Sequence, residues 1–182
     1  ADEDKIAETD LRMVEAAAFA VANCLRHTMG LVCYICLDQS EEPLISPCPC
    51  RGTNAGVHFS CLRSWYEHRA EWTDLKCKQC KHNFDGSTAV ALGEIGLRMV
   101  EESEESDDTD LAVMLVNLGN AYGRLGDPGR QRDLLERALV IKKSVCGAGH
   151  RETAITQYFY AFCLKSLGLK EEAVQEMQEA AE

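Results

Sequence analysis

The feature that most constrains this chain is a series of seven cysteines and one histidine between residues 33 and 80. In order, its members are Cys33, Cys36, Cys48, Cys50, His58, Cys61, Cys77 and Cys80. Closely paired thiolates and imidazoles are the ligand pattern of zinc, which takes four of them in a tetrahedron. Eight ligands therefore predict two structural Zn²⁺ ions, each with a closed coordination sphere, and neither ion should be catalytic.

The spacing alone does not say which ligands share an ion. In a sequential arrangement, the first ion would take Cys33, Cys36, Cys48 and Cys50. In an interleaved arrangement, one ion takes Cys33, Cys36, His58 and Cys61, and the other takes Cys48, Cys50, Cys77 and Cys80. Both arrangements remain open at this level.

Other cysteines and histidines of the chain have no partner at metal-binding spacing. Cys24, Cys146 and Cys163 occupy apolar positions of helical patterns, so we expect buried free thiols. We expect surface or structural roles for the remaining histidines, which are His27, His68, His82 and His150.

The ligand series resembles the RING-CH family, a RING variant whose fourth ligand is Cys and whose fifth is His. The resemblance rests on the Cys48-x-Cys50 pair, the seven-residue gap before His58, and Trp65 four residues after Cys61. That family is cross-braced, so the resemblance implies the interleaved pairing. A PHD finger has the same ligand order but usually carries a Trp where this chain has Leu75.

The resemblance also implies an activity. RING fingers act as ubiquitin ligases that dock a ubiquitin-charged conjugating enzyme and contribute positioning rather than a nucleophile. By this resemblance Ile35 and Trp65 would contact the conjugating enzyme, and Lys81 would bridge it to ubiquitin. Lys78 and Gln79 stand where ordinary RING fingers add a Pro contact, which weakens that part of the surface. No residue of the chain is expected to be catalytic.

Residues 85–182 show a helical repeat with a spacing of 42 residues, in which Leu125-Gly126 recurs as Leu167-Gly168. Helices are predicted at about 87–103, 109–125, 129–145, 152–167 and 170–181, with Gly as a C-terminal cap. Together with the Gly147-x-x-His150 turn, the pattern resembles tetratricopeptide repeats of the kinesin-light-chain type. Such repeats imply a surface that binds a protein or peptide partner.

The predicted fold is mixed and has three parts. An amphipathic helix lies in residues 1–30, with its apolar stripe between Asp4 and His27. A small two-zinc RING-CH finger follows at 31–84, and an all-α repeat array occupies 85–182. Glu101 to Asp110 is strongly acidic, and we expect a solvated loop between helices there.

Composition excludes some classes of function. The net charge of −11 argues against nucleic acid as the main partner. The most apolar run, from Met13 to Leu25, is too short to span a bilayer and no secretory signal opens the chain, so we expect a cytoplasmic or nuclear protein.

Three hypotheses about function follow. The first is a ubiquitin ligase whose repeats recruit a substrate. The second is a non-catalytic zinc-stabilised scaffold, and the third is a chromatin reader, which would require an aromatic cage.

Overall fold

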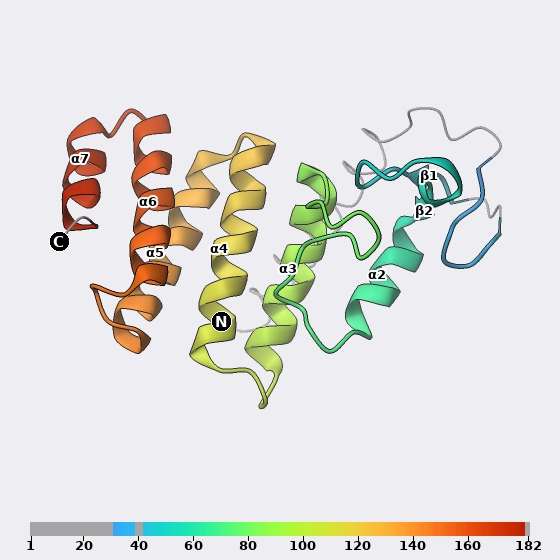
Figure 1. The fold of residues 1–182 in the computed structure, drawn as a ribbon, viewed down its shortest axis with the longest axis horizontal. Coiled ribbons are helices and arrows are strands. Elements are labelled where there is room, and N and C mark those ends of the chain that lie inside the picture. Colours follow the sequence, from blue (N-terminus) through green and yellow to red (C-terminus); the bar gives the residue numbers. More distant parts are fainter. Residues whose placement is uncertain (1–30, 39–41, 181–182) are drawn as a thin grey trace, which may run out of the picture. The chain divides into compact units, whose positions relative to one another are not determined.

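The computed structural model describes residues 31–38 and 42–180 of the 182-residue chain (Figure 1). It divides into two compact units, residues 1–96 and residues 97–182, which are described separately. The helix predicted within residues 1–30 lies outside the described residues, as does Cys24. Among the residues described, no helix is long and apolar enough to cross a membrane.

The first unit contains the finger, which has little regular structure. Strand β1 (Leu44–Ile45) pairs antiparallel with β2 (Val57–His58), a 3-10 turn η1 (Gly52–Asn54) lies between them, and α2 (Phe59–Glu67) follows directly. A small apolar core lies under these elements, made of Ile45, Val57, Leu62, Tyr66, Leu75 and Phe84. Two-residue strands and so small a core cannot by themselves hold a chain folded.

Helix α2 begins without a cap from its own N-cap residue. His58 occupies the N-cap position, and its side chain makes no capping hydrogen bond. Instead, the Glu42 carboxylate accepts hydrogen bonds from the backbone N–H of Ser60, at 3.0 Å, and from its hydroxyl. A carboxylate at a helix N-terminus is also favoured by the helix dipole. Glu42 therefore serves as the cap of α2 in place of His58.

Helix α3 (Gly86–Glu102) follows the finger and confirms the helix predicted at 87–103. Every residue from Ser87 to Leu97 is buried. The residues of this stretch are mostly Ala, Val, Leu, Ile and Gly on all sides of the helix, which is typical of a helix enclosed by its surroundings.

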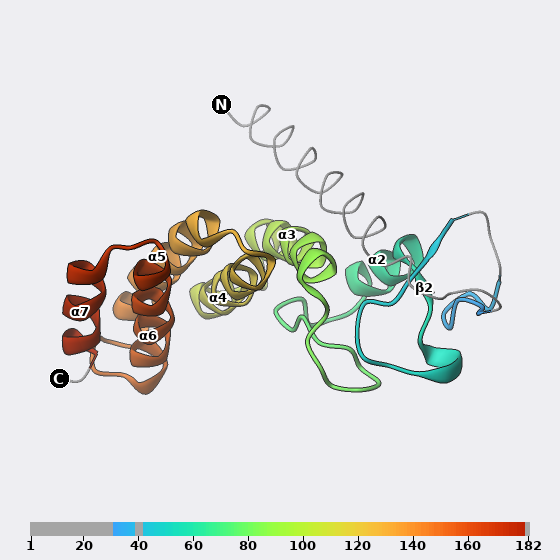
Figure 2. The ribbon, with the colours of Figure 1, turned by 90° about the horizontal axis from the view of Figure 1, so that it is seen from above.

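The second unit is all helical. Helices α4 (Asp108–Leu125), α5 (Pro128–Val145), α6 (Arg151–Ser166) and α7 (Lys170–Glu179) pack in chain order, each against the next (Figures 1 and 2). All four predicted helices are confirmed, and no end is displaced by more than two residues. The register of the 42-residue repeat therefore located every helix of this unit.

Turns and close contacts in this unit follow from the residue types. Gly126 ends α4 in the left-handed conformation, with φ of 90°, as predicted for a C-terminal cap. Gly119 lets α5 approach α4 closely, because a Cβ there would lie 3.3 Å from Leu135 Cγ. His150 is the N-cap of α6, and its ring accepts a hydrogen bond from the backbone N–H of Glu152.

Two expectations need correction in detail. The acidic run is a loop only over residues 103–107, because Asp107 caps α4 by accepting from the N–H groups of Thr109 and Asp110. Acidic side chains are favoured at this position by the unpaired N–H groups of the helix. Cys163 is fully buried as expected, but Cys146 is only half-buried because it lies at the C-cap of α5.

Candidate functional site

The eight predicted ligands form two clusters in the folded chain. In each cluster the four ligand atoms lie within 4.8 Å of one another. One cluster holds Cys33, Cys36, His58 and Cys61, and the other holds Cys48, Cys50, Cys77 and Cys80. The arrangement is therefore interleaved, and the sequential alternative is excluded.

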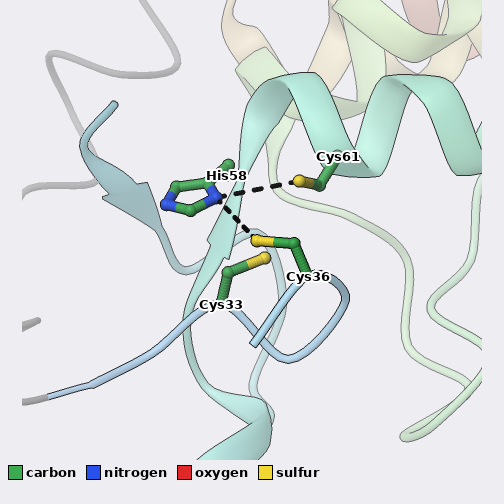
Figure 3. Close-up of side chains that lie close together, drawn as sticks. All are labelled: Cys33, Cys36, His58 and Cys61. Carbon is green, nitrogen blue, oxygen red and sulfur yellow. Dashed lines mark hydrogen bonds between the residues drawn. The ribbon is translucent and has the colours of Figure 1, made fainter. Parts of the chain in front are cut away.

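The cluster that contains His58 joins the first Cys-x-x-Cys loop to the continuous segment of β2 and α2 (Figure 3). His58 at the end of β2 and Cys61 in the first turn of α2 face Cys33 and Cys36 on their loop. His58 Nδ1 lies 3.4 Å from Cys36 Sγ and 3.7 Å from Cys61 Sγ. This engagement explains why His58 does not cap the helix it begins.

The distances fit zinc. A tetrahedron with Zn–S bonds of about 2.3 Å and Zn–N bonds of about 2.0 Å has edges of about 3.8 Å between sulfurs and about 3.5 Å between sulfur and nitrogen. The sulfurs of Cys50 and Cys77 lie 3.8 Å apart in the second cluster. Both donor sets are thus compatible with a structural zinc ion, and four protein ligands leave no position for a substrate.

The two Cys-x-x-Cys segments have the same backbone shape. After each pair, Leu37 or Lys81 adopts a left-handed conformation with φ of 62°. The N–H of Leu37 donates to the Cys33 carbonyl at 2.8 Å, and that of Lys81 donates to the Cys77 carbonyl at 2.9 Å. Each segment therefore folds its two thiols toward one point, which is the geometry a shared metal ion requires.

The thiol acidities differ within the finger. Burial raises the pKa of Cys50 to about 11 and that of Cys61 to about 12. A hydrogen bond from the backbone of His82 is the main cause that lowers the pKa of Cys80 to about 6. Zinc binds thiolates, so metal binding at neutral pH releases protons from the thiols of Cys50 and Cys61.

Two of the predicted docking residues meet in one pocket. Ile35, from the first Cys-x-x-Cys segment, and Trp65, from α2, line a surface pocket together with Ser60, Cys61, Ser64 and His68. Ile35 is 38% exposed and Trp65 is half-buried. Trp65 lies on α2, which also contains Cys61. Lys81 is exposed at the end of the second Cys-x-x-Cys segment and does not line this pocket.

Some residues of the site were missed by the sequence reasoning. No motif marks Glu42, which caps α2, because its role depends on a contact that forms only after folding. The same holds for Arg69, whose guanidinium lies over the Trp65 ring. The serines and His68 of the pocket recur at helical spacing around Trp65, so the one-turn period of α2 could have indicated them.

The finger and the helices together define a protein with a cross-braced zinc-binding module and a tetratricopeptide-like array. Residues 33–80 match the family described as the RING-variant domain, and residues 110–182 match the family described as tetratricopeptide repeat. The chain thus carries a RING-CH finger compatible with two structural zinc ions, followed by tetratricopeptide repeats.

The finger is similar to those of ubiquitin ligases. It is 41% identical over 56 residues to the E3 ubiquitin-protein ligase MARCHF1 of Homo sapiens, which is 29% of this chain and 18% of the relative. It is 38% identical over 56 residues to the mouse E3 ubiquitin-protein ligase MARCHF6, 29% of this chain and 6% of the relative. A third match, at 33% over 69 residues, is the ERAD-associated E3 ubiquitin-protein ligase DOA10 of Saccharomyces cerevisiae, covering 34% of this chain and 5% of the relative. The chain spans less than a fifth of the length of these curated relatives.

Proposed function

We propose that this chain is a RING-type ubiquitin ligase whose finger, at residues 31–84, docks a ubiquitin-charged conjugating enzyme. The observation that carries the proposal is the shared pocket of Ile35 and Trp65, which lie 30 residues apart in the sequence. An aliphatic and an aromatic side chain that remain partly exposed beside the ligand Cys61 form a surface suited to a partner protein. The similarity of the finger to named ubiquitin ligases supports the same conclusion.

The finger would act by positioning. The reacting groups belong to the conjugating enzyme's thioester and to a substrate lysine, so the ligase needs a fixed surface and no nucleophile of its own. Lys81 would bridge the conjugating enzyme and ubiquitin from the edge of the second Cys-x-x-Cys segment. Its amide is fixed by the hydrogen bond to Cys77, which limits where its ammonium group can reach.

The repeats would bind the substrate or another protein partner. Tyr158 and Phe162 stand one turn apart on α6, and their side chains are 52% and 60% exposed. Exposed aromatic residues are enriched in protein interfaces, which supports a contact surface on this helix. Thiolate ligands persist where thiols stay reduced, so we place the activity in the cytoplasm or the nucleus.

Autoubiquitination tests the proposal. The purified chain is incubated with ubiquitin, activating enzyme, ATP and a panel of conjugating enzymes, beside the Ile35→Ala variant. We expect ladders with the parent chain and a loss of at least about tenfold in rate for Ile35→Ala, since truncation of an interface anchor costs roughly 2 kcal/mol.

A matched control is Leu37→Ala. Leu37 lies in the same segment and is 75% exposed, but it does not line the pocket. Its variant should retain the ladders. An equal loss in both variants would point to damage of the zinc site rather than to docking.

A scaffold without ligase activity is the second candidate. Lys78 and Gln79 are both exposed and polar where a further apolar contact would strengthen docking. If no conjugating enzyme gives ladders with a chain that holds two zinc ions, this candidate replaces the first.

A further inference from the structure

Arg69 makes an unusual set of contacts beside the pocket. It lies two residues beyond the end of α2, and its guanidinium carbon lies 5.2 Å from the ring centroid of Trp65 and 4.5 Å from that of Tyr66. Both distances are within the range of a cation–π interaction. One cation therefore contacts two consecutive aromatic side chains, and only one of them lines the pocket.

The guanidinium is itself held in place. Its Nε donates a hydrogen bond to the Glu71 carbonyl, and its Nη2 donates to the Asp74 carbonyl. Within the described part of the chain, its buried Nη1 has no hydrogen-bond partner. A buried donor without a partner costs free energy. The two hydrogen bonds to carbonyls and the contacts with the two rings must offset that cost for the guanidinium to keep this orientation.

Tyr66 provides a fixed support. Its side chain is fully buried in the finger core, and its hydroxyl donates to the Trp72 carbonyl. Trp65 is the more exposed of the two residues, since it is half-buried whereas Tyr66 is fully buried. A guanidinium anchored to two carbonyls and to Tyr66 therefore restricts the Trp65 ring on the side that it covers.

We propose that Arg69 is a positioning residue for conjugating-enzyme docking, and that it acts by holding the Trp65 ring in the orientation that shapes the pocket with Ile35. This inference rests on the proposed function. An ordered anchor binds more tightly than a mobile one, because less conformational freedom is lost when the partner docks. A planar guanidinium can stack on a ring while donating in two directions, whereas an ammonium cannot, so lysine is not an equivalent residue here.

A purely structural role is the competing explanation. Arg69 could serve only to close the loop between α2 and Cys77 through the carbonyls of Glu71 and Asp74. The two explanations differ in whether Trp65 is needed for the effect of Arg69.

Binding is measured with the full chain and the conjugating enzyme that gives the strongest ladders, its catalytic cysteine replaced to prevent turnover. We expect Arg69→Met to weaken binding by about 3- to 10-fold, the range that one cation–π contact represents. The matched control is Arg63→Met, which removes an exposed arginine of α2 whose Nε donates to the Glu67 carboxylate at 2.7 Å. It should leave affinity within about twofold, as expected for a surface ion pair.

The double variant decides between the explanations. In a Trp65→Ala background, Arg69→Met should have no further effect on affinity, because the ring through which it acts is gone. An equal loss in both backgrounds would overturn the proposal in favour of the structural role. Zinc content of two ions per chain is required of every variant.

Fluorescence quenching tests the same contact without any partner. The Trp72→Phe variant leaves Trp65 as the chain's single tryptophan, since the sequence has two. We expect Arg69→Met to increase acrylamide quenching of Trp65, and unchanged quenching would overturn the proposal. If no conjugating enzyme gives ladders, the proposed function fails, and quenching still decides whether Arg69 restrains Trp65.

Discussion

The finger and the repeats reach a folded state by different physical means. The finger has two strands of two residues each and a helix of nine residues, whereas α4 and α5 of the repeats have 18 residues each. The repeats bury apolar side chains along facing helices, including Met114, Leu115, Leu118 and Leu135. The finger instead gathers eight metal ligands around two points.

This difference teaches where the stability of each part comes from. Helices of this length become stable when an apolar face packs against neighbours, and the repeats supply those neighbours from within the same unit. The finger has too little regular structure and too small a core for that, so metal binding must supply its folding free energy. Damage to one part should therefore leave the other part folded.

Loss of a zinc ligand should have the largest effect. We expect Cys48→Ser, or removal of zinc by a strong chelator, to unfold the finger, because structural zinc contributes roughly 10–16 kcal/mol. The helical signal of residues 97–182 should persist in circular dichroism, and limited proteolysis should cut first within residues 31–84.

Cys163→Ser is the matched control for this experiment. Cys163 is buried in α6, outside both clusters, with its thiol against the Pro128 carbonyl at 3.1 Å. That variant should keep two zinc ions per chain. If Cys48→Ser or the chelator removed the helical signal of residues 97–182 together with the zinc, the two parts would not fold independently.

A cavity in the repeats should have the next largest effect on stability. This effect should be confined to the repeats and leave the finger unchanged. Leu135 is fully buried against Gly119, so Leu135→Ala should lower the free energy of unfolding of the repeats by about 2–5 kcal/mol. Val140→Ala, on the same helix but 66% exposed, should cost no more than about 0.5 kcal/mol. Denaturant titration measures both, and zinc content should not change in either.

Substitutions at positions of positive φ should have a smaller effect on stability. Their sign should be opposite in the repeats and in the finger. The repeats place Gly126 at positive φ, while the finger places Leu37 there. Gly126→Ala should destabilise the repeats by about 1 kcal/mol, and Leu37→Gly should stabilise the folded finger by up to about 1 kcal/mol. Thermal unfolding of the repeats and the midpoint of zinc release measure the two changes. A destabilising Leu37→Gly would show that the Leu37 side chain, rather than its backbone, matters to the finger.

The repeats could be predicted from the sequence in detail. Their helices follow from local signals, such as the Leu-Gly pairs, the 42-residue register and the Gly147-x-x-His150 turn. These signals act within one or two turns of the chain, so no knowledge of distant contacts was needed to place α4 to α7. The ligand set of the finger could be read in the same way, because zinc demands particular residue types at close spacing.

The tertiary structure decided what local spacing leaves open. Which thiols share an ion depends on how β2 and α2 return to the first loop, and the spacing admitted two answers. Ile35 and Trp65, which the family resemblance named as separate contacts, line one pocket in the folded chain. Glu42 caps α2 in place of His58 through a contact with Ser60, 18 residues away, that no motif indicates. The sequence by itself thus determined the metal, its ligands and the helical register, since those are set by residue type and short-range geometry. The surface available to a partner was determined only by folding, because a surface is formed by side chains that the chain brings together from distant positions.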